Sequence, residues 1–166
     1  MATTVEMPRS TVQPEHATGV RVLRIAGGRP LHGSVKIGGA KNAALPALAA
    51  TLLTSEECTL HNVPDLADIE TMLALLRSLG AETERDRKRK LVRVRAAAIT
   101  STAAPADLVG KMRASFLVAG PLLARCGEMS ASTPGGCQLG ARPVDVDVRG
   151  FRQMGAKMTF PDGGQF

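Results

Sequence analysis

Aromatic side chains, cysteine pairs and long hydrophobic runs are all scarce in this chain of 166 residues. Aromatic residues make up 2% of the sequence, so few surfaces exist on which nucleic-acid bases could stack. The 3 cysteines form no Cys-x-x-Cys pair, which argues against a disulfide framework and against a zinc site. No apolar run has membrane-spanning length, and residues 1–19 lack the apolar centre of a secretory signal. We therefore expect a cytoplasmic protein without membrane insertion and without a metal.

The net charge of +6 is concentrated in one part of the chain. Seven basic and three acidic residues lie between Glu82 and Arg95, and Arg85 to Lys90 form an unbroken charged run. This run separates two strand-like stretches, so a solvated hairpin turn is the simplest interpretation. A nucleic-acid interface would spread its basic residues along a face and would add aromatic platforms. We expect no nucleic-acid partner, and a basic nucleic-acid module is a distant alternative.

The first part of the chain predicts a flexible extension followed by a β-hairpin. Residues 1–19 are polar and without periodicity, which is typical of a flexible segment. Val20–Ile25 and Ser34–Ile37 alternate apolar and polar residues around a Gly-Gly-Arg-Pro turn. A glycine turn and an alanine-rich helix come next. Proline is tolerated in the first helical turn, so Pro46 predicts a helix start between Asn42 and Leu45, with Asn42 as N-cap and Lys41 beside it.

Apolar spacing predicts further elements up to residue 125. We expect a strand over Cys58–Val63, a helix over Asp65–Gly80 that Gly80 ends, and a two-stranded ribbon over Ala81–Arg95. A linker then leads to a helix over Asp107–Arg125, interrupted at Gly120-Pro121 and buried on most sides.

The second half of the chain repeats the first. Leu52-Leu53 and Leu122-Leu123 both close alanine-rich helices, and Leu79-Gly80-Ala81 recurs as Met154-Gly155-Ala156. The first pair of matching segments is 70 positions apart and the second pair is 75 positions apart. The second half of the chain therefore contains five additional residues, and they fall on a glycine-rich loop. We expect an α/β fold, α+β by some schemes, with repeat units over residues 20–100 and 105–166. The second unit lacks a return strand, so the chain is expected to be shorter than its natural folding unit.

The segment after that loop fits two patterns. Val144 to Arg149 alternates like a strand, whereas Val144, Val148, Phe151 and Met154 form a helical stripe. Early aspartates and Gly155 at the end favour a helix, which is our prediction.

The glycine-rich loop carries the first candidate catalytic residue. Residues 134–143 read Pro-Gly-Gly-Cys-Gln-Leu-Gly-Ala-Arg-Pro, which places Cys137 where backbone can approach a ligand closely. The spacing alone supports two interpretations of Cys137 equally well. It is either a residue of an ordinary turn or a residue with a chemical role. Lys41, Arg113 and Arg142 each lie near a glycine turn or a helix start, where phosphate or carboxylate binds readily. Each of these cations, taken alone, could be an ordinary solvated surface residue. The three together indicate a site for an anionic substrate.

Three segments resemble, in order and approximate spacing, the motifs of the UDP-N-acetylglucosamine enolpyruvyl transferase family. They are Gly39–Pro46, Lys111–Ser115 and Pro134–Asp145, and the resemblance covers about residues 20–166. The related shikimate-pathway enzyme has a serine-containing lysine motif, so the Lys41-Asn42 pair and Cys137 favour the amino-sugar family.

The resemblance implies a fold and a reaction. The fold is an inside-out α/β barrel of repeated β-α-β-α-β-β units, incomplete in this chain. The reaction transfers enolpyruvyl from phosphoenolpyruvate to the 3-hydroxyl of UDP-N-acetylglucosamine and releases phosphate, the first committed step of peptidoglycan synthesis. No cofactor is implied. The family's catalytic aspartate and a further arginine belong to a part that this chain lacks, so the chain alone is expected to be inactive. A non-catalytic remnant that binds a sugar nucleotide is the alternative.

The resemblance also implies residue roles. Cys137 would donate a proton to phosphoenolpyruvate, Lys41, Asn42 and Arg142 would bind that substrate, and Arg113 would bridge both substrates. The stretch that would contact the sugar nucleotide comprises Arg142, Pro143, Val144, Asp145 and Val146. The chain departs from the family at Val146 and Asp147, where leucine and histidine are usual.

Overall fold

The computed structural model describes Gly28, Pro30 and residues 32–132 and 144–159. The predicted extension over residues 1–19, the predicted strand Val20–Ile25 and the loop with Cys137, Arg142 and Pro143 lie outside the described residues. The chain divides into two compact units, Met1–Ile37 and Gly38–Phe166, and each is described here by itself.

The second half of the predicted hairpin is wrong. Ser34–Ile37 forms no strand, and Val35 and Ile37 are 85% and 81% exposed. A strand needs a hydrogen-bonded neighbour and a surface that covers its apolar face. In the described part of this unit the two side chains have no such cover.

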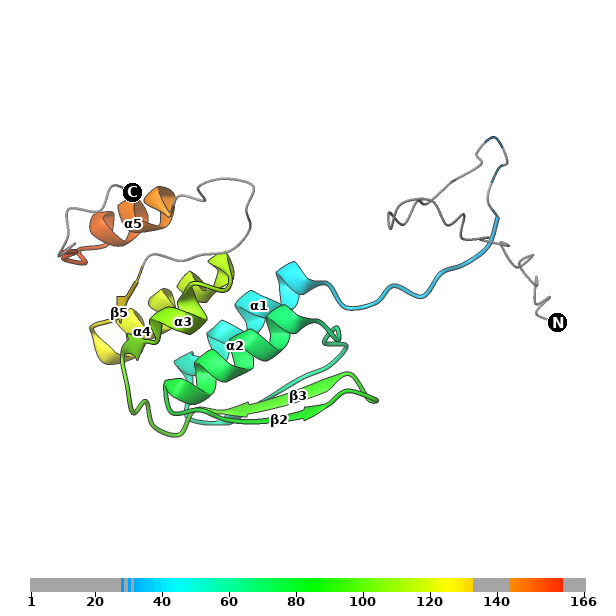
Figure 1. The fold of residues 1–166 in the computed structure, drawn as a ribbon, viewed down its shortest axis with the longest axis horizontal. Helices are drawn as coiled ribbons and strands as arrows, with labels where there is room; N and C mark the ends of the chain where they lie inside the picture. The colour runs from blue at the N-terminus through cyan, green and yellow to red at the C-terminus, as the bar shows by residue number, and fades with distance from the viewer. Residues whose placement is uncertain (1–27, 29, 31, 133–143, 160–166) are drawn as a thin grey trace, which may run out of the picture. The chain divides into compact units, whose positions relative to one another are not determined.

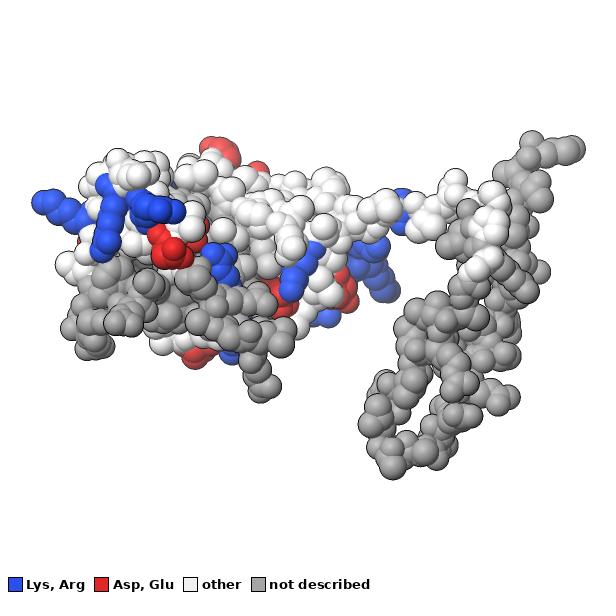
Figure 2. Space-filling model, turned by 90° about the horizontal axis from the view of Figure 1, so that it is seen from above, with Lys and Arg blue, Asp and Glu red and all other residues white. Residues whose placement is uncertain are grey.

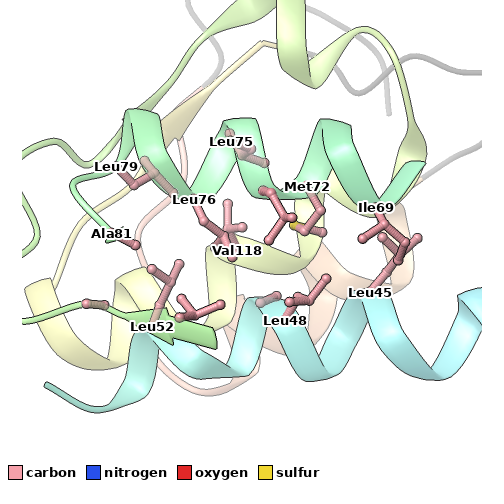
Figure 3. Packing of buried hydrophobic residues seen from close by; sticks show 14 of the residues in the cluster. Leu45, Leu48, Leu52, Ile69, Met72, Leu75, Leu76, Leu79, Ala81 and Val118 are labelled. Carbon is pink, nitrogen blue, oxygen red and sulfur yellow. The ribbon is translucent and has the colours of Figure 1, made fainter. Parts of the chain in front are cut away.

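Two helices that run side by side form the framework of the larger unit (Figure 1). They are α1, Lys41–Ala50, continued by the 3-10 turn η1, Thr51–Leu53, and α2, Ala67–Ser78. Figure 3 shows the side chains of α1 and η1 facing those of α2, in an order that makes the two helices parallel. The fully buried residues at this contact are Leu48, Leu52, Ile69, Met72, Leu76 and Leu79. Leucine and methionine at helical spacing bury a continuous apolar stripe, which is what holds the pair together.

The start of α1 differs from the prediction. The helix begins at Lys41, and its N-cap is Ala40, whose backbone is extended and which offers no side-chain cap. Asn42 is therefore inside the helix, and so is Pro46. Pro46 is exposed, so its ring lies on the outer surface of α1, and the helix lacks one backbone donor at this position.

The buried side of the helix pair lies on a small antiparallel sheet. Its strands are β1, Glu57–Leu60, β2, Glu82–Asp86, and β3, Leu91–Arg95, in the order β1-β3-β2. Val92 and Val94 of the central strand are buried, whereas the outer face carries charge. There Arg93 lies 2.9 Å from Glu84 and 3.9 Å from Glu57. The hydrogen bond that Arg93 donates to Glu84, together with that carboxylate's charge, raises the pKa of Arg93.

The basic run at the β2–β3 hairpin is not simply solvated. The Arg85 side chain is only 9% exposed and forms ion pairs with Glu70 and Asp65. Arg87 reaches the same two carboxylates, at 2.7 Å and 3.2 Å. The predicted ribbon is confirmed, but a solvated turn describes only its tip, because a nearly buried guanidinium must be paired. Figure 2 shows acidic groups next to basic groups on the described surface, which weakens the nucleic-acid alternative further.

The predicted long helix over residues 107–125 is broken earlier than expected. The structure has α3, Ala106–Val109, the 3-10 segment η2, Arg113–Val118, and α4, Ala119–Cys126. Gly120 and Pro121 lie at the start of α4, where proline is tolerated, so they do not break the helix. The sequence before and after these helices forms a short parallel pair, β4, Ala103–Ala104, with β5, Ser130–Ala131. The linker prediction missed β4.

The predicted helix after the loop is confirmed as α5, Asp145–Gln153. Three main-chain hydrogen bonds at its end recur at the corresponding positions of α2. Ala81 donates to Leu76 at 3.0 Å, and Ala156 donates to Phe151 at 2.9 Å. Gly80 and Gly155, with φ of 106° and 96°, supply the left-handed residue that this helix ending needs. The recurrence seen in the sequence is therefore also a recurrence of backbone geometry.

These elements make a mixed α/β fold, as expected. The sheets of the described part are one of three strands and one of two, and neither closes on itself. The barrel therefore stays a prediction. Among the described residues, no helix is both long and apolar enough to cross a membrane.

Candidate functional site

The start of α1 borders a surface pocket of about 400 Å³. The pocket is lined by the turn Gly38–Ala40, by Ala43, Ala44 and Ala47 of α1, and by residues 60–63 at and after the end of β1. A helix start presents backbone N–H groups without intrahelical partners, together with the positive end of the helix dipole. Gly39 and Ala40 of the first predicted anion-binding motif line this pocket, whereas Lys41 and Asn42 do not.

Gly39 is required for this geometry. A Cβ added at Gly39 would lie 1.7 Å from the carbonyl oxygen of Asn62. Asn62 itself has a φ of 57°, in the left-handed region that asparagine tolerates better than most residues. The two segments thus meet backbone to backbone, and both Gly39 and Asn62 line the pocket.

Lys41 and Asn42 both lie at the exposed start of α1. The ammonium of Lys41 lies 2.7 Å from Asp68 of α2, and the two side chains are 46% and 37% exposed. Asn42 is exposed and adjacent to Lys41. Two of the three predicted phosphoenolpyruvate ligands are therefore together and open to solvent, and Lys41 already has a carboxylate partner.

Arg113 begins η2 and is paired with α5. Its Nη2 donates to Asp147 at 3.3 Å, and the side chains are 42% and 41% exposed. The apolar run that follows Arg113 buries Ser115 and Val118 and leaves the guanidinium at the surface. Ser115 is satisfied by the carbonyl oxygens of Met112 and Val109.

The start of α5 lies against η2. Phe116 and Phe151 contact each other with ring centroids 6.3 Å apart, and Val144 and Val148 are buried. Asp145 and Val146 are exposed, Val146 to 63%. Of the predicted sugar-nucleotide contacts, Val144 is therefore a packing residue whose side chain is withdrawn from solvent, while its two neighbours are accessible.

The structure joins the predicted site residues in two groups. Lys41 and Asn42 share the start of α1, and Arg113 lies beside the segment of Asp145 and Val146. The two groups are linked through packing, because α1 contacts both α2 and η2. Each cation has its ion pair on a different helix, α2 for Lys41 and α5 for Arg113. Cys137, Arg142 and Pro143 lie outside the described residues.

The described ranges hold no group of three or more His, Cys, Asp or Glu side chains that could bind a metal ion. Cys58 and Cys126 are free thiols.

The arrangement of cations at helix starts can bind anionic groups and stabilise developing negative charge.

Comparison with known proteins identifies the family. Residues 25–165 match the family model of EPSP synthase (3-phosphoshikimate 1-carboxyvinyltransferase). This chain belongs to the EPSP synthase family. Within the family it is similar to proteins named UDP-N-acetylglucosamine 1-carboxyvinyltransferase. One from Granulibacter bethesdensis is 54% identical over 141 residues, and one from Rhodospirillum centenum is 53% identical over 150 residues.

These matches cover 85% and 86% of this chain but 34% of each relative. The chain thus spans about a third of the length of these EPSP synthase family members. Among solved structures, it is similar to the enolpyruvyl transferase NikO from Streptomyces tendae, with 30% identity and a TM-score of 0.52 over 61% of this chain and 23% of NikO. The structure and the relatives together support an enolpyruvyl transferase fold.

Two residues of the candidate site escaped the sequence reasoning. Asp68 and Asp147 are the carboxylate partners of the two predicted cations, and neither was singled out as a partner. Both stand in the first turn of a helix, where aspartate is common for local reasons, so nothing in the sequence distinguished them.

Proposed function

We propose that the chain is the N-terminal part of a UDP-N-acetylglucosamine 1-carboxyvinyltransferase. The observation that carries this proposal is the identity of 54% and 53%, over 85% and 86% of the chain, to two relatives with that name. The completed enzyme transfers enolpyruvyl from phosphoenolpyruvate to the 3-hydroxyl of UDP-N-acetylglucosamine. It works in the cytoplasm, in the first committed step of peptidoglycan synthesis, and needs no cofactor. Its repeat units build an inside-out α/β barrel that this chain leaves incomplete.

The reaction adds one group and removes another. The Cys137 thiol gives its proton to C3 of phosphoenolpyruvate while the sugar oxygen bonds to C2 and loses its own proton to a base, for which the family's aspartate outside this chain is the candidate. This forms a tetrahedral ketal. The bond between C2 and the phosphate oxygen then breaks, a proton passes from C3 back to the thiolate, and phosphate departs with the enolpyruvyl double bond restored. Fixed cations favour the addition because negative charge gathers near the phosphate and carboxylate.

The described residues would divide this work between two groups. Lys41 and Asn42, at the start of α1, would hold phosphoenolpyruvate together with Arg142. Arg113, beside Asp145 and Val146, would reach the sugar nucleotide and bridge the two substrates. Supporting this division are the exposure of Lys41 and Arg113 and their position at the starts of helical segments. The further catalytic groups would come from the two-thirds of the relatives' length that the chain does not match.

The test compares the 166-residue chain with the protein expressed from the complete reading frame. The completed protein should release phosphate only when both substrates are present, and fosfomycin should label Cys137 rather than Cys58 or Cys126, which mass spectrometry would show. Substituting Cys137→Ala should abolish both labelling and phosphate release. Absence of phosphate release by the completed wild-type protein would refute the proposal. Calorimetric binding of UDP-N-acetylglucosamine without turnover would favour the non-catalytic remnant instead.

A further inference from the structure

The ion pair between Lys41 and Asp68 joins the starts of two parallel helices. Lys41 is the first residue of α1, and Asp68 stands in the first turn of α2. Because α1 and α2 run in the same direction, these two turns lie at the same end of the layer (Figures 1 and 3). The ammonium nitrogen lies 2.7 Å from the carboxylate oxygen Oδ2. A contact between residues so far apart in the sequence requires the packed helix pair.

We propose that Asp68 is a positioning residue for Lys41. It holds the ammonium group in the place where the phosphate or carboxylate of phosphoenolpyruvate binds. This inference rests on the proposed function, because the role of Lys41 toward that substrate comes from there. Asp68 itself need not touch the substrate.

The chemistry of lysine explains why positioning matters. A lysine side chain has a flexible four-carbon stem, and fixing it on a ligand costs conformational entropy. An ion pair present in the free protein removes part of that cost. The ammonium group has three N–H donors, and an ion pair with the single oxygen Oδ2 of Asp68 can engage at most part of this set. The remaining donors can serve an anionic ligand without displacing Asp68.

The negative charge of Asp68 should repel an anion bound to Lys41, but the dipole of α2 reduces this repulsion. A helix start carries the equivalent of about half a positive elementary charge, and Asp68 lies in the first turn of α2. This field offsets much of the repulsion between Asp68 and an anion on Lys41. Lys41 lies at the positive end of α1, where the helix dipole disfavours a cation. The ion pair with Asp68 of α2 compensates for this unfavourable position.

The experiment measures phosphoenolpyruvate affinity by calorimetry on the protein from the complete reading frame. The variants are Asp68→Asn, Asp68→Glu, Lys41→Ala and the double variant Lys41→Ala/Asp68→Asn. We expect Asp68→Asn to weaken binding about three- to five-fold, the range of a solvent-exposed ion pair, and Asp68→Glu to restore part of it. In the Lys41→Ala background, Asp68→Asn should cause no further loss. The matched control is Asp107→Asn, which changes a first-turn aspartate of α3 and should leave affinity unchanged.

The possible outcomes separate this inference from the proposed function. If the wild-type protein fails to bind phosphoenolpyruvate, the proposed function falls and this inference falls with it. If the wild type binds and Asp68→Asn binds equally or more tightly, only the positioning role is overturned. A loss that persists in the Lys41→Ala background would show that Asp68 acts through folding, which a fall in the melting temperature of Asp68→Asn would corroborate.

Discussion

The guanidinium of Arg125 donates a hydrogen bond of 2.9 Å to the carbonyl oxygen of Leu52, where the first alanine-rich helix ends. It also donates to Thr54 at 3.1 Å and to Ala97 at 3.1 Å. One side chain of α4 thus satisfies three carbonyl groups that lie earlier in the sequence. The last carbonyl groups of a helix have no partner within the helix, so the contact with Leu52 supplies a donor where the backbone needs one.

Substituting Arg125→Ala should lower the free energy of unfolding by about 1–3 kcal/mol, because it leaves partly buried carbonyl groups without their donor. Urea denaturation followed by circular dichroism would measure the change. Lys88→Ala, in the exposed hairpin turn, serves as the control and should change stability by less than about 0.5 kcal/mol. Equal stability of Arg125→Ala and wild type would mean that water replaces the guanidinium at no cost.

Substituting Gly39→Ala should be strongly destabilising, because the new Cβ would lie 1.7 Å from the Asn62 carbonyl oxygen, which is backbone and cannot rotate away. We expect a loss of about 3 kcal/mol or more, or a chain that does not fold. Gly120→Ala provides the contrast. A Cβ there meets no atom within 4 Å, and alanine is the better helix former, so Gly120→Ala should be neutral or stabilising by up to about 1 kcal/mol. Thermal unfolding of both variants would decide.

Substituting Glu70→Gln should lower stability by about 1–3 kcal/mol, because the nearly buried Arg85 and its neighbour Arg87 lose a shared carboxylate. Asp65 remains as a partner, which keeps the loss below that of an isolated buried charge. Glu82→Gln changes an exposed carboxylate of the same hairpin and should have little effect. A stability difference between the two variants that disappears at high salt would show that the network is screened like a surface pair.

Substituting Arg113→Ala in the completed protein should weaken UDP-N-acetylglucosamine binding about ten-fold or more, the effect of losing a charged hydrogen bond to an anionic ligand. The measurement is calorimetry with the sugar nucleotide alone. Arg149→Ala removes a solvent-exposed arginine of α5 and should leave the affinity unchanged. If both variants bind equally, the guanidinium of Arg113 serves to hold Asp147 and α5 rather than the ligand.

Some elements could be predicted because their apolar residues are regularly spaced and a glycine follows the last of them. The helix ending at Gly80, the ribbon after it and the helix over Asp145–Gln153 all followed from apolar spacing and a glycine stop. The start of α1 was missed because Asn42 suggested a cap where an extended Ala40 already sets the boundary. The preference of asparagine for the N-cap position did not decide where α1 begins. The backbone conformation after the glycine turn did, because Ala40 is already extended there.

The candidate site was only partly predictable, for a different reason. Lys41 and Arg113 could be singled out because they stand beside glycine turns and helix starts, which are local features. Their partners Asp68 and Asp147 come from other helices, and only packing brings them within 2.7 Å and 3.3 Å. A contact of this kind has no local signal, so sequence reasoning finds one half of each pair.

The matched endings of α2 and α5 bear on how such a chain can diversify. The direction in which the backbone leaves each helix is set by one glycine and by main-chain hydrogen bonds, which do not depend on the identity of the helical side chains. The helix surfaces can therefore differ, with α2 burying an apolar stripe of the core and α5 burying Val148, while the exit path stays the same. Residues 70–81 and 145–156 thus share the way in which the backbone leaves the helix, although their side chains pack in different surroundings.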